Sequence, residues 1–202
     1  MSEAVNYPVM ERFYTIQGEG YNTGRAAYFI RLGGCDVGCV WCDVKESWEA
    51  GKHPLLSTVQ LIDEVKKTPA ESIVVTGGEP AMYDLEPLTN SIHAAMLDAW
   101  IETSGAYLIT GDWEWICVSP KKFKKPVAES LYKANELKVV IYNKSDFDFA
   151  LENAKGVNPD CLLFIQPEFS KRDEMIPLIV DFVKAHPQWR VSLQTHKYLH
   201  IP

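Results

Sequence analysis

The 202-residue chain contains no apolar stretch that approaches the roughly 20 residues needed to cross a membrane as a helix. Its first residues, Met-Ser-Glu-Ala-Val-Asn, do not combine a basic region with an apolar run, so we expect no secretory signal. Cysteine is scarce: there are five, and their spacings show no disulfide framework. We therefore expect a cytoplasmic protein in a reducing compartment, with no membrane partner.

Positive charge is also in short supply. The chain has 20 Lys and Arg against 27 Asp and Glu, a formal net charge of −7. Proteins that grip a polyanion normally carry a basic patch, and the one basic run here is Lys121-Lys122-Phe-Lys124-Lys125. We interpret this run as a solvated loop and expect no nucleic-acid partner.

A glycine-rich dinucleotide fingerprint is missing after the first apolar strand, which counts against a Rossmann domain. The length fits one domain with a substantial core. Hydrophobic residues make up 47% and charged residues 23%, values ordinary for a globular protein. We predict a single domain over residues 1–202.

Three of the five cysteines nevertheless fall within eight residues, in Cys35-Asp-Val-Gly-Cys39-Val-Trp-Cys42. Three thiolates in one loop can each ligate one iron of a [4Fe–4S] cube and leave the fourth iron open to a small molecule. A structural zinc site needs a fourth ligand, and Cys117 and Cys161 are distant, in apolar runs. We prefer the cluster. A zinc site completed by His53 across a charged linker stays open, and it would make the chain a non-catalytic zinc-binding module.

Apolar strands alternate with amphipathic helices along the chain, which predicts right-handed βαβ units around a parallel sheet. We expect strands over 10–17, 26–32, 72–76, 99–103, 115–118, 137–142, 161–166 and 190–193, and helices over 57–67, 85–97, 127–134, 145–154 and 173–185. The chain is short for a complete eight-fold barrel. The predicted fold class is therefore α/β, a partial, open (β/α) barrel with a reduced number of helices.

Ligand-like motifs directly follow the predicted strands. They are the cysteine loop, Thr76-Gly77-Gly78-Glu79-Pro80, Ser119-Pro120-Lys121 and Gln166-Pro167. Barrels place active sites at the C-terminal ends of their strands, and paired glycines let a ligand approach the main chain closely. Arg31, near the end of an apolar strand, should meet an anion there, and its fork suits a carboxylate.

The spacing of the cysteines, with an aromatic residue before the last, resembles the cluster loop of the radical S-adenosylmethionine (SAM) superfamily. Further motifs narrow the resemblance to one family within it, the 7-carboxy-7-deazaguanine synthases. These are Ile16-Gln17-Gly18-Glu19-Gly20, Arg31, the Gly-Gly-Glu-Pro and Ser-Pro-Lys motifs, Gln166-Pro167 and Gln194-Thr195-His196-Lys197. They run from residue 16 almost to residue 202 in the expected order, so the resemblance covers essentially the whole chain and implies the abbreviated radical-SAM-type barrel.

The resemblance implies cofactors and their ligands. Cys35, Cys39 and Cys42 would hold a [4Fe–4S] cluster, whose open iron chelates SAM and whose electron cleaves it to a 5′-deoxyadenosyl radical. The residues expected around SAM are Trp41, Cys42, Asp43, Gly78, Ser119, Pro120, Lys121, Gln166, Pro167, Glu168 and Phe169. No side chain is assigned as a catalytic acid or base, because the cofactors carry the reaction.

The implied reaction is a ring contraction of 6-carboxy-5,6,7,8-tetrahydropterin to 7-carboxy-7-deazaguanine with loss of ammonia, a carbon–nitrogen lyase step in queuosine biosynthesis. The residues expected around the pterin are Ile16, Gln17, Gly18, Glu19, Arg31, Thr76, His196 and Pro202. Leu199 and Ile201 are apolar and would pack if the end were docked, so the Pro202 α-carboxylate is expected to accept hydrogen bonds from the pterin edge.

One position departs from the family pattern. A threonine commonly follows the last cluster cysteine by two residues and reaches a Mg²⁺; here Val44 offers no side-chain oxygen. Because Mg²⁺ tolerates several water ligands, we still expect it, bound through substrate, solvent or Asp43.

The resemblance also implies a homodimer and an electron donor such as flavodoxin. The alternative enzyme is a small activating enzyme that makes a glycyl radical on a partner protein.

Overall fold

A computed structural model describes residues 5–202. The nine strands within these residues join one sheet, in the order β3-β1-β2-β4-β5-β6-β7-β8-β9. Strand β1 pairs antiparallel with β2 and β3, whereas every pairing from β2 to β9 is parallel. The strands are β1 Asn6–Ile16, β2 Ala26–Leu32, β3 Leu55–Ser57, β4 Ser72–Gly77, β5 Asp98–Thr103, β6 Trp115–Val118, β7 Glu136–Ile141, β8 Leu162–Pro167 and β9 Trp189–Val191.

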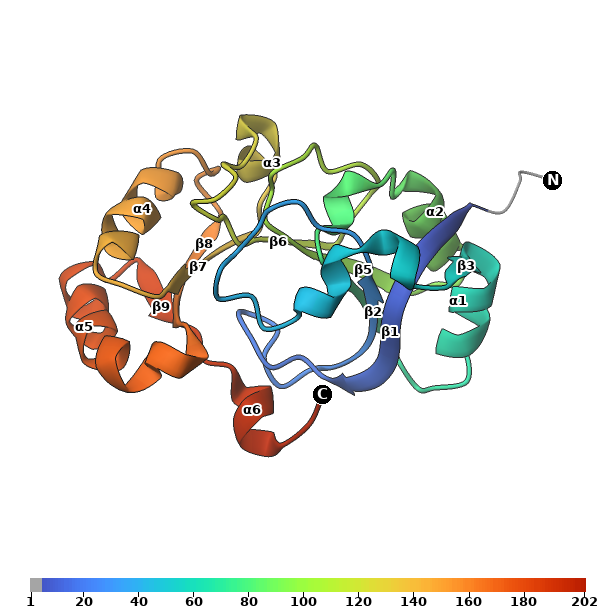
Figure 1. Ribbon diagram of the computed structural model, residues 1–202, viewed down its shortest axis with the longest axis horizontal. Coiled ribbons are helices and arrows are strands. Elements are labelled where there is room, and N and C mark those ends of the chain that lie inside the picture. Colours follow the sequence, from blue (N-terminus) through green and yellow to red (C-terminus); the bar gives the residue numbers. More distant parts are fainter. Residues whose placement is uncertain (1–4) are drawn as a thin grey trace.

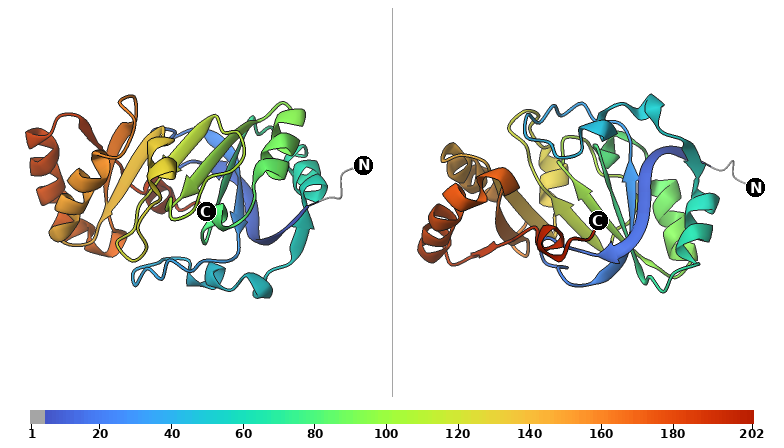
Figure 2. Two further views of the ribbon diagram at one scale, coloured as in Figure 1. Left: turned by 90° about the horizontal axis from the view of Figure 1, so that it is seen from above. Right: turned by 60° about the horizontal axis from the view of Figure 1, so that its bottom comes forward.

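The sheet curls but stays open, with helices on its outer side (Figures 1 and 2). The α-helices are α1 Thr58–Val65, α2 Glu86–Ala94, α3 Ala128–Tyr132, α4 Ser145–Ala154, α5 Arg172–Ala185 and α6 Thr195–Leu199. Short 3₁₀ turns cover Lys45–Trp48, Ala50–Lys52, Pro80–Met82 and Phe169–Lys171. Strand β5 reaches β6 without a helix between them. The predicted open α/β barrel with few helices is therefore confirmed, while the extent of a single domain stays a prediction.

Side chains alternate between the two faces of the sheet, as a strand requires. On β4, Ile73 and Val75 join the large core under the helices. Val74 points the other way and packs with Phe29 and Trp100 in a smaller cluster. This second cluster lies on the concave side of the sheet, where Phe29 and its stacked neighbour Phe13 also line the pocket described below.

Most predicted elements are present, with shifted ends. The capping box that opens α1 is confirmed: the Gln60 amide N donates to Ser57 Oγ at 3.2 Å and the Ser57 amide N donates to Gln60 Oε1 at 2.9 Å. Helix α2 ends at Ala94, short of the predicted residue 97, because Met96 has a left-handed φ of 59°. Strand β1 is longer than predicted, and β3 and α6 were not predicted. Within residues 5–202 no helix is long and apolar enough to cross a membrane.

Candidate active site

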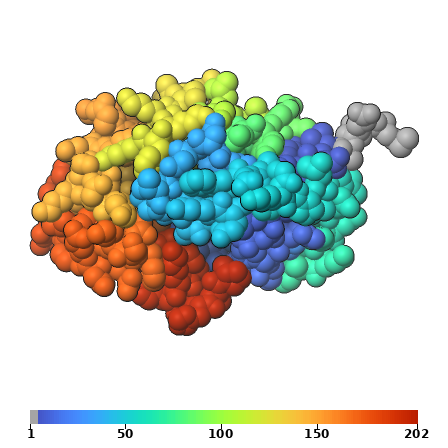
Figure 3. All heavy atoms as spheres, in the orientation of Figure 1, coloured from blue at the N-terminus to red at the C-terminus, as the bar shows by residue number. Residues whose placement is uncertain are grey.

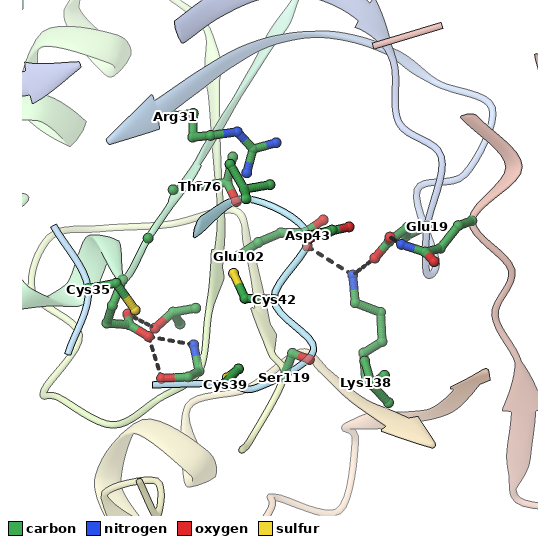
Figure 4. A pocket seen from close by; sticks show the side chains of 18 of the residues that line it. Glu19, Arg31, Cys35, Cys39, Cys42, Asp43, Thr76, Glu102, Ser119 and Lys138 are labelled. Carbon is green, nitrogen blue, oxygen red and sulfur yellow. Dashed lines mark hydrogen bonds and ion pairs between the residues drawn. The ribbon is translucent and has the colours of Figure 1, made fainter. Parts of the chain in front are cut away.

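A cavity of about 270 Å³ opens at the C-terminal ends of the parallel strands. Every residue expected to hold the cluster or the pterin lines it. The lining residues named from sequence are Ile16, Gln17, Gly18, Glu19, Arg31, Cys35, Cys39, Trp41, Cys42, Asp43, Thr76, Gly78, Ser119, Lys121, Gln166, Glu168, His196 and Pro202. In Figure 4 the three cysteines lie on one side of this pocket, with Glu19 and Lys138 on the other. One cavity therefore brings together the two groups of motifs.

The cysteine loop, residues 35–42, is held against the Lys45–Trp48 turn and β4. The Cys35 amide N donates to Trp48 O at 3.1 Å, and Cys39 packs with Val37 and Ala106. Burial raises the pKa of the Cys39 thiol to about 11 and raises that of Cys35. The thiols are partly or fully shielded, as suits ligands of a cofactor that must be kept from water.

The donor set fits a cluster better than a single zinc ion. Within residues 5–202, no three His, Cys, Asp or Glu side chains are placed to hold one metal ion. A zinc site needs its ligands to converge on one point. A [4Fe–4S] cube takes one thiolate on each iron, so three cysteines around it need not converge.

The Gly-Gly-Glu-Pro segment is fixed against the cysteine loop. A Cβ on Gly78 would lie 2.3 Å from Gly34 O and 2.8 Å from Cys35 Cβ, so only glycine permits this approach. Glu79 is 1% exposed and accepts from the Ala81 and Ser104 amides at 3.0 and 2.8 Å, and from the Thr103 and Ser104 hydroxyls. These donors hold the loop in place at the pocket wall.

The wall opposite the cluster is built from two distant segments. The Thr195 amide N and hydroxyl both donate to Gly18 O at 2.9 Å. A Cβ on Gly18 would lie 2.3 Å from His196 Nδ1, so the residue must be glycine. Pro202 O lies 3.5 Å from Thr15 Oγ1, which places the end of the described chain at the pocket. Figure 3 shows this C-terminal segment beside β1, with the segment after β2 crossing the same face.

Arg31 is already paired: its Nε donates to Glu11 Oε1 at 2.6 Å. Glu11 lies on the neighbouring strand, directly across the pairing register from Arg31. No local pattern in the sequence indicates this partner. Because the contact uses Nε, the outer guanidinium nitrogens stay available to the cavity that Arg31 lines.

Three residues expected around SAM do not line the pocket. Pro120 and Pro167 are buried in the structure behind the neighbouring lining residues. The Phe169 ring packs instead on Tyr198 of α6, with a centroid separation of 6.1 Å, and lies 4.6 Å from Lys197 Nζ. Contact of these three residues with SAM stays a prediction.

The comparisons with known proteins agree with this geometry. The sequence model of the Radical SAM superfamily matches residues 29–139. The 7-carboxy-7-deazaguanine synthase of Flavobacterium psychrophilum is 61% identical over 195 residues, spanning 96% of this chain and 92% of the relative. The Synechocystis enzyme of the same name is 45% identical over 96% of this chain and 93% of its own. This chain belongs to the 7-carboxy-7-deazaguanine synthase family.

A solved structure supports the same family. The crystal structure of QueE from Escherichia coli superposes with a TM-score of 0.85 at 33% identity, covering 94% of each chain. Membership of the radical SAM superfamily implies a [4Fe–4S] cluster and SAM as cofactors. The glycyl-radical activating enzyme and the zinc module are therefore set aside.

Two charged lining residues of this family member were missed from sequence. Lys138 is on β7 with its side chain 3% exposed, and its Nζ lies 2.6 Å from Glu19 Oε2 and 2.8 Å from Glu102 Oε2. Gln17 Nε2 donates to Glu102 Oε1 at 2.7 Å, which ties the Ile-Gln-Gly segment to β5. The available signal was a charged residue inside an apolar strand, in Trp-Ile-Glu102-Thr and in Leu-Lys138-Val-Val.

Burial and Lys138 together set the ionisation of this cluster. Burial alone would raise the pKa of Glu19, but the Lys138 ammonium and hydrogen bonds from Lys138 and Gln194 lower it well below its usual range. Burial opposes the charge on Lys138, and the nearby anionic groups, Glu102 and Glu19 among them, raise its pKa well above the ordinary value. Glu19 and Lys138 are therefore both charged at neutral pH, and with Glu102 they form the charged layer at the floor of the pocket.

Proposed function

We propose that this protein converts 6-carboxy-5,6,7,8-tetrahydropterin to 7-carboxy-7-deazaguanine with release of ammonia, as a radical SAM lyase supplying 7-deazapurine for queuosine. The observation that carries the proposal is the single pocket in which the three cysteines face the Gln17, Arg31 and Pro202 wall. A reactive group on one side and a polar recognition surface on the other are what a substrate-modifying site requires.

The cofactor half of the pocket would be formed as follows. Cys35, Cys39 and Cys42 would hold the cluster, which with bound SAM supplies a carbon radical that takes a hydrogen atom from the substrate. Gly78 would let the main chain approach the methionyl end of SAM, and Trp41 would lie beside its adenosyl part. Lys121 Nζ is held by Ser119 Oγ at 2.7 Å, 5.8 Å from the Trp41 ring centroid, so it stiffens this wall.

The substrate half offers complementary groups. The outer nitrogens of Arg31 can bind the pterin carboxylate in parallel hydrogen bonds. Thr76 and the Gln17 segment line the cavity between Arg31 and the charged layer. His196 stays neutral more readily than an ordinary histidine, because burial lowers its pKa. A neutral imidazole can accept from one of the pterin N–H groups.

The deciding experiment is anaerobic incubation of the reconstituted protein with SAM, reductant and the carboxypterin, followed by mass spectrometry. The expected products are 7-carboxy-7-deazaguanine and ammonia. Formation of 5′-deoxyadenosine without any change in the pterin would show that the substrate assignment is wrong.

We expect the α-carboxylate of Pro202 to bind the pterin edge, so a peptide added after Pro202 should impair substrate binding selectively. Each charge-assisted hydrogen bond lost costs about 1.5–3 kcal/mol, which is at least tenfold in KM for the pterin. Cluster content should be unchanged, and an N-terminal tag of the same length should be harmless. Full activity with the C-terminal peptide would exclude the carboxylate as a ligand.

We propose that Mg²⁺ binds weakly, through substrate, water and Asp43. Val44 lines the pocket without an oxygen, and Asp43 Oδ2 lies 3.4 Å from Lys197 Nζ, a contact that competes with a divalent ion. Replacing Val44 with Thr adds a ligand and should increase the stimulation by Mg²⁺ several-fold, measured as rate against Mg²⁺ concentration; Val44→Ala is the control for size. An equally strong, saturable response in the wild type would contradict this.

Three further expectations rest on the resemblance. An electron donor such as flavodoxin would reduce the cluster, which optical reduction by purified flavodoxin tests. A homodimer would appear at twice the chain mass in light scattering after size-exclusion chromatography. A cytoplasmic location would appear on fractionation of cells that express the protein.

A further inference from the structure

A second, smaller cavity of about 10 Å³ lies beneath the pocket floor. Gln17, Glu19 and Glu102 line both cavities, so they form the partition between them. Glu136 lines the small cavity but not the larger pocket, and the reaction scheme above does not use it. The volume is about that of one water molecule, and the carboxylates and amides around it supply the polar partners that a buried water needs.

Glu136 is 2% exposed and has no cation within ion-pair distance among the described residues. Its Oε2 accepts from the Tyr21 amide N at 3.0 Å and from Trp115 Nε1 at 3.2 Å. Its Oε1 lies 3.7 Å from the Cys117 thiol, a weak donor. The carboxyl is therefore buried with neutral hydrogen-bond partners only.

The charges around Glu136 favour its protonated form. Lys138 follows it by two residues on the same face of β7, but its ammonium is already shared by Glu19 and Glu102. A third ionised carboxylate would leave the layer with a net charge of −2 away from water. Burial raises the pKa of Glu136, Glu102 raises it further, and Lys138 and the Tyr21 amide oppose the shift.

We propose that Glu136 stores a proton beneath the active site and exchanges it with Glu102 through one water in the small cavity. The inference rests on the proposed function. Elimination of ammonia breaks a C–H and a C–N bond, forms a C=C bond, and moves one proton from carbon to nitrogen. Glu102 passes the proton of Glu136 to the leaving amine and returns to Glu136 a proton taken from carbon, so nothing is consumed and bulk water stays out. It acts through Glu102 and does not touch the substrate.

The direct test is infrared spectroscopy of the reconstituted protein at neutral pH. The C=O stretch of a protonated carboxyl should be present in the wild type and in Glu129→Gln, a change at an exposed glutamate of α3. It should be absent in Glu136→Gln, which keeps an oxygen to accept from Trp115 and Tyr21. A spectrum of Glu136→Gln identical to wild type would overturn the proposal.

Kinetics provide the second readout. In Glu136→Gln we expect kcat to fall roughly tenfold, a modest share of what acid–base groups contribute, with KM for the pterin, cluster content and SAM cleavage unchanged. An unchanged kcat would overturn the storage role. A wild type that shows the infrared band and makes no deazaguanine would refute the proposed function and not the protonation.

The wild type alone gives a third readout, which does not depend on a variant folding. The pKa of Glu136 is raised above the unfolded value of 4.5, so the folded state binds this proton more tightly. Stability from it is present below pH 4.5 and is lost as the pH rises through the folded pKa. The infrared band should disappear over the same upper range; a band lost already near pH 4.5 would overturn the proposal.

Discussion

Replacing Cys39 with Ala is expected to abolish both the iron–sulfur cluster and the formation of 5′-deoxyadenosine. The cube would keep two protein ligands from one loop, and there is no substitute nearby: among residues 5–202 no other cysteine lines the pocket with Cys35, Cys39 and Cys42. Iron and sulfide analysis after anaerobic reconstitution, with the optical spectrum, measures the loss directly. We expect about four irons per chain in the wild type.

Cys117 provides the matched control. Its thiol is buried on β6 beside Glu136 and outside the cysteine loop. Cys117→Ala should leave the iron content unchanged and cost about 1 kcal/mol or less, since one small atom is removed from a packed site. Loss of iron in Cys117→Ala, or its retention in Cys39→Ala, would refute the assignment of the cluster ligands.

Replacing Lys138 with Met is expected to lower the free energy of unfolding by about 3 kcal/mol, because it leaves two largely buried carboxylates without their cation. The estimate is at the low end for broken buried pairs, since the side chains of Glu19 and Glu102 are 16% and 23% exposed to the pocket. Denaturant unfolding of the holoprotein under anaerobic conditions measures it. Product formation should fall as well, because Gln17 depends on Glu102 for its position.

The contribution of the Glu19–Lys138 pair to the free energy of unfolding depends on pH. The pKa of Glu19 is lowered from 4.5 and that of Lys138 is raised above 10.5. The pair therefore stabilises the fold fully between these two values, and the contribution is lost as the pH falls toward the folded pKa of Glu19 or rises through that of Lys138. In Lys138→Met this plateau should be missing. Lys138→Arg, which keeps the charge, should retain most of it, and equal losses in both variants would point to packing alone.

The parts of the fold that local sequence determines were predictable. The Ser57–Gln60 capping box and the apolar run of β2 each involve residues that lie close together in the sequence. Both are present in the structure as expected. Strand β3 has three residues and exists through its pairing with β1, Asn6 opposite Ser57. Helix α6 has five residues, too few to be stable alone. Such elements depend on tertiary contacts that no local pattern reports.

The residues of the candidate site also fall into two groups: those within local motifs, and those brought together only by the tertiary structure. The cysteine loop and the glycine motifs carry their chemistry in adjacent residues, so the sequence located them. Glu102 and Lys138 stand alone in apolar strands, and their pairing becomes evident only when β5 and β7 lie on either side of β6 in the sheet. The contact between Arg31 and Glu11 likewise depends on strand register.

The bonds between Thr195 and Gly18 join residues 177 positions apart. During synthesis, the sheet from β1 to β8 can begin to pair while residues after 190 are still inside the ribosome, as domains generally fold from the N-terminal side. The pocket wall opposite the cysteine loop, built from the Gly18 segment and the residues from Thr195 onward, cannot form at that stage. Its C-terminal half is still inside the ribosome. Cluster ligands are all present by residue 42. A nascent chain should therefore become able to take up iron well before it becomes able to recognise its substrate.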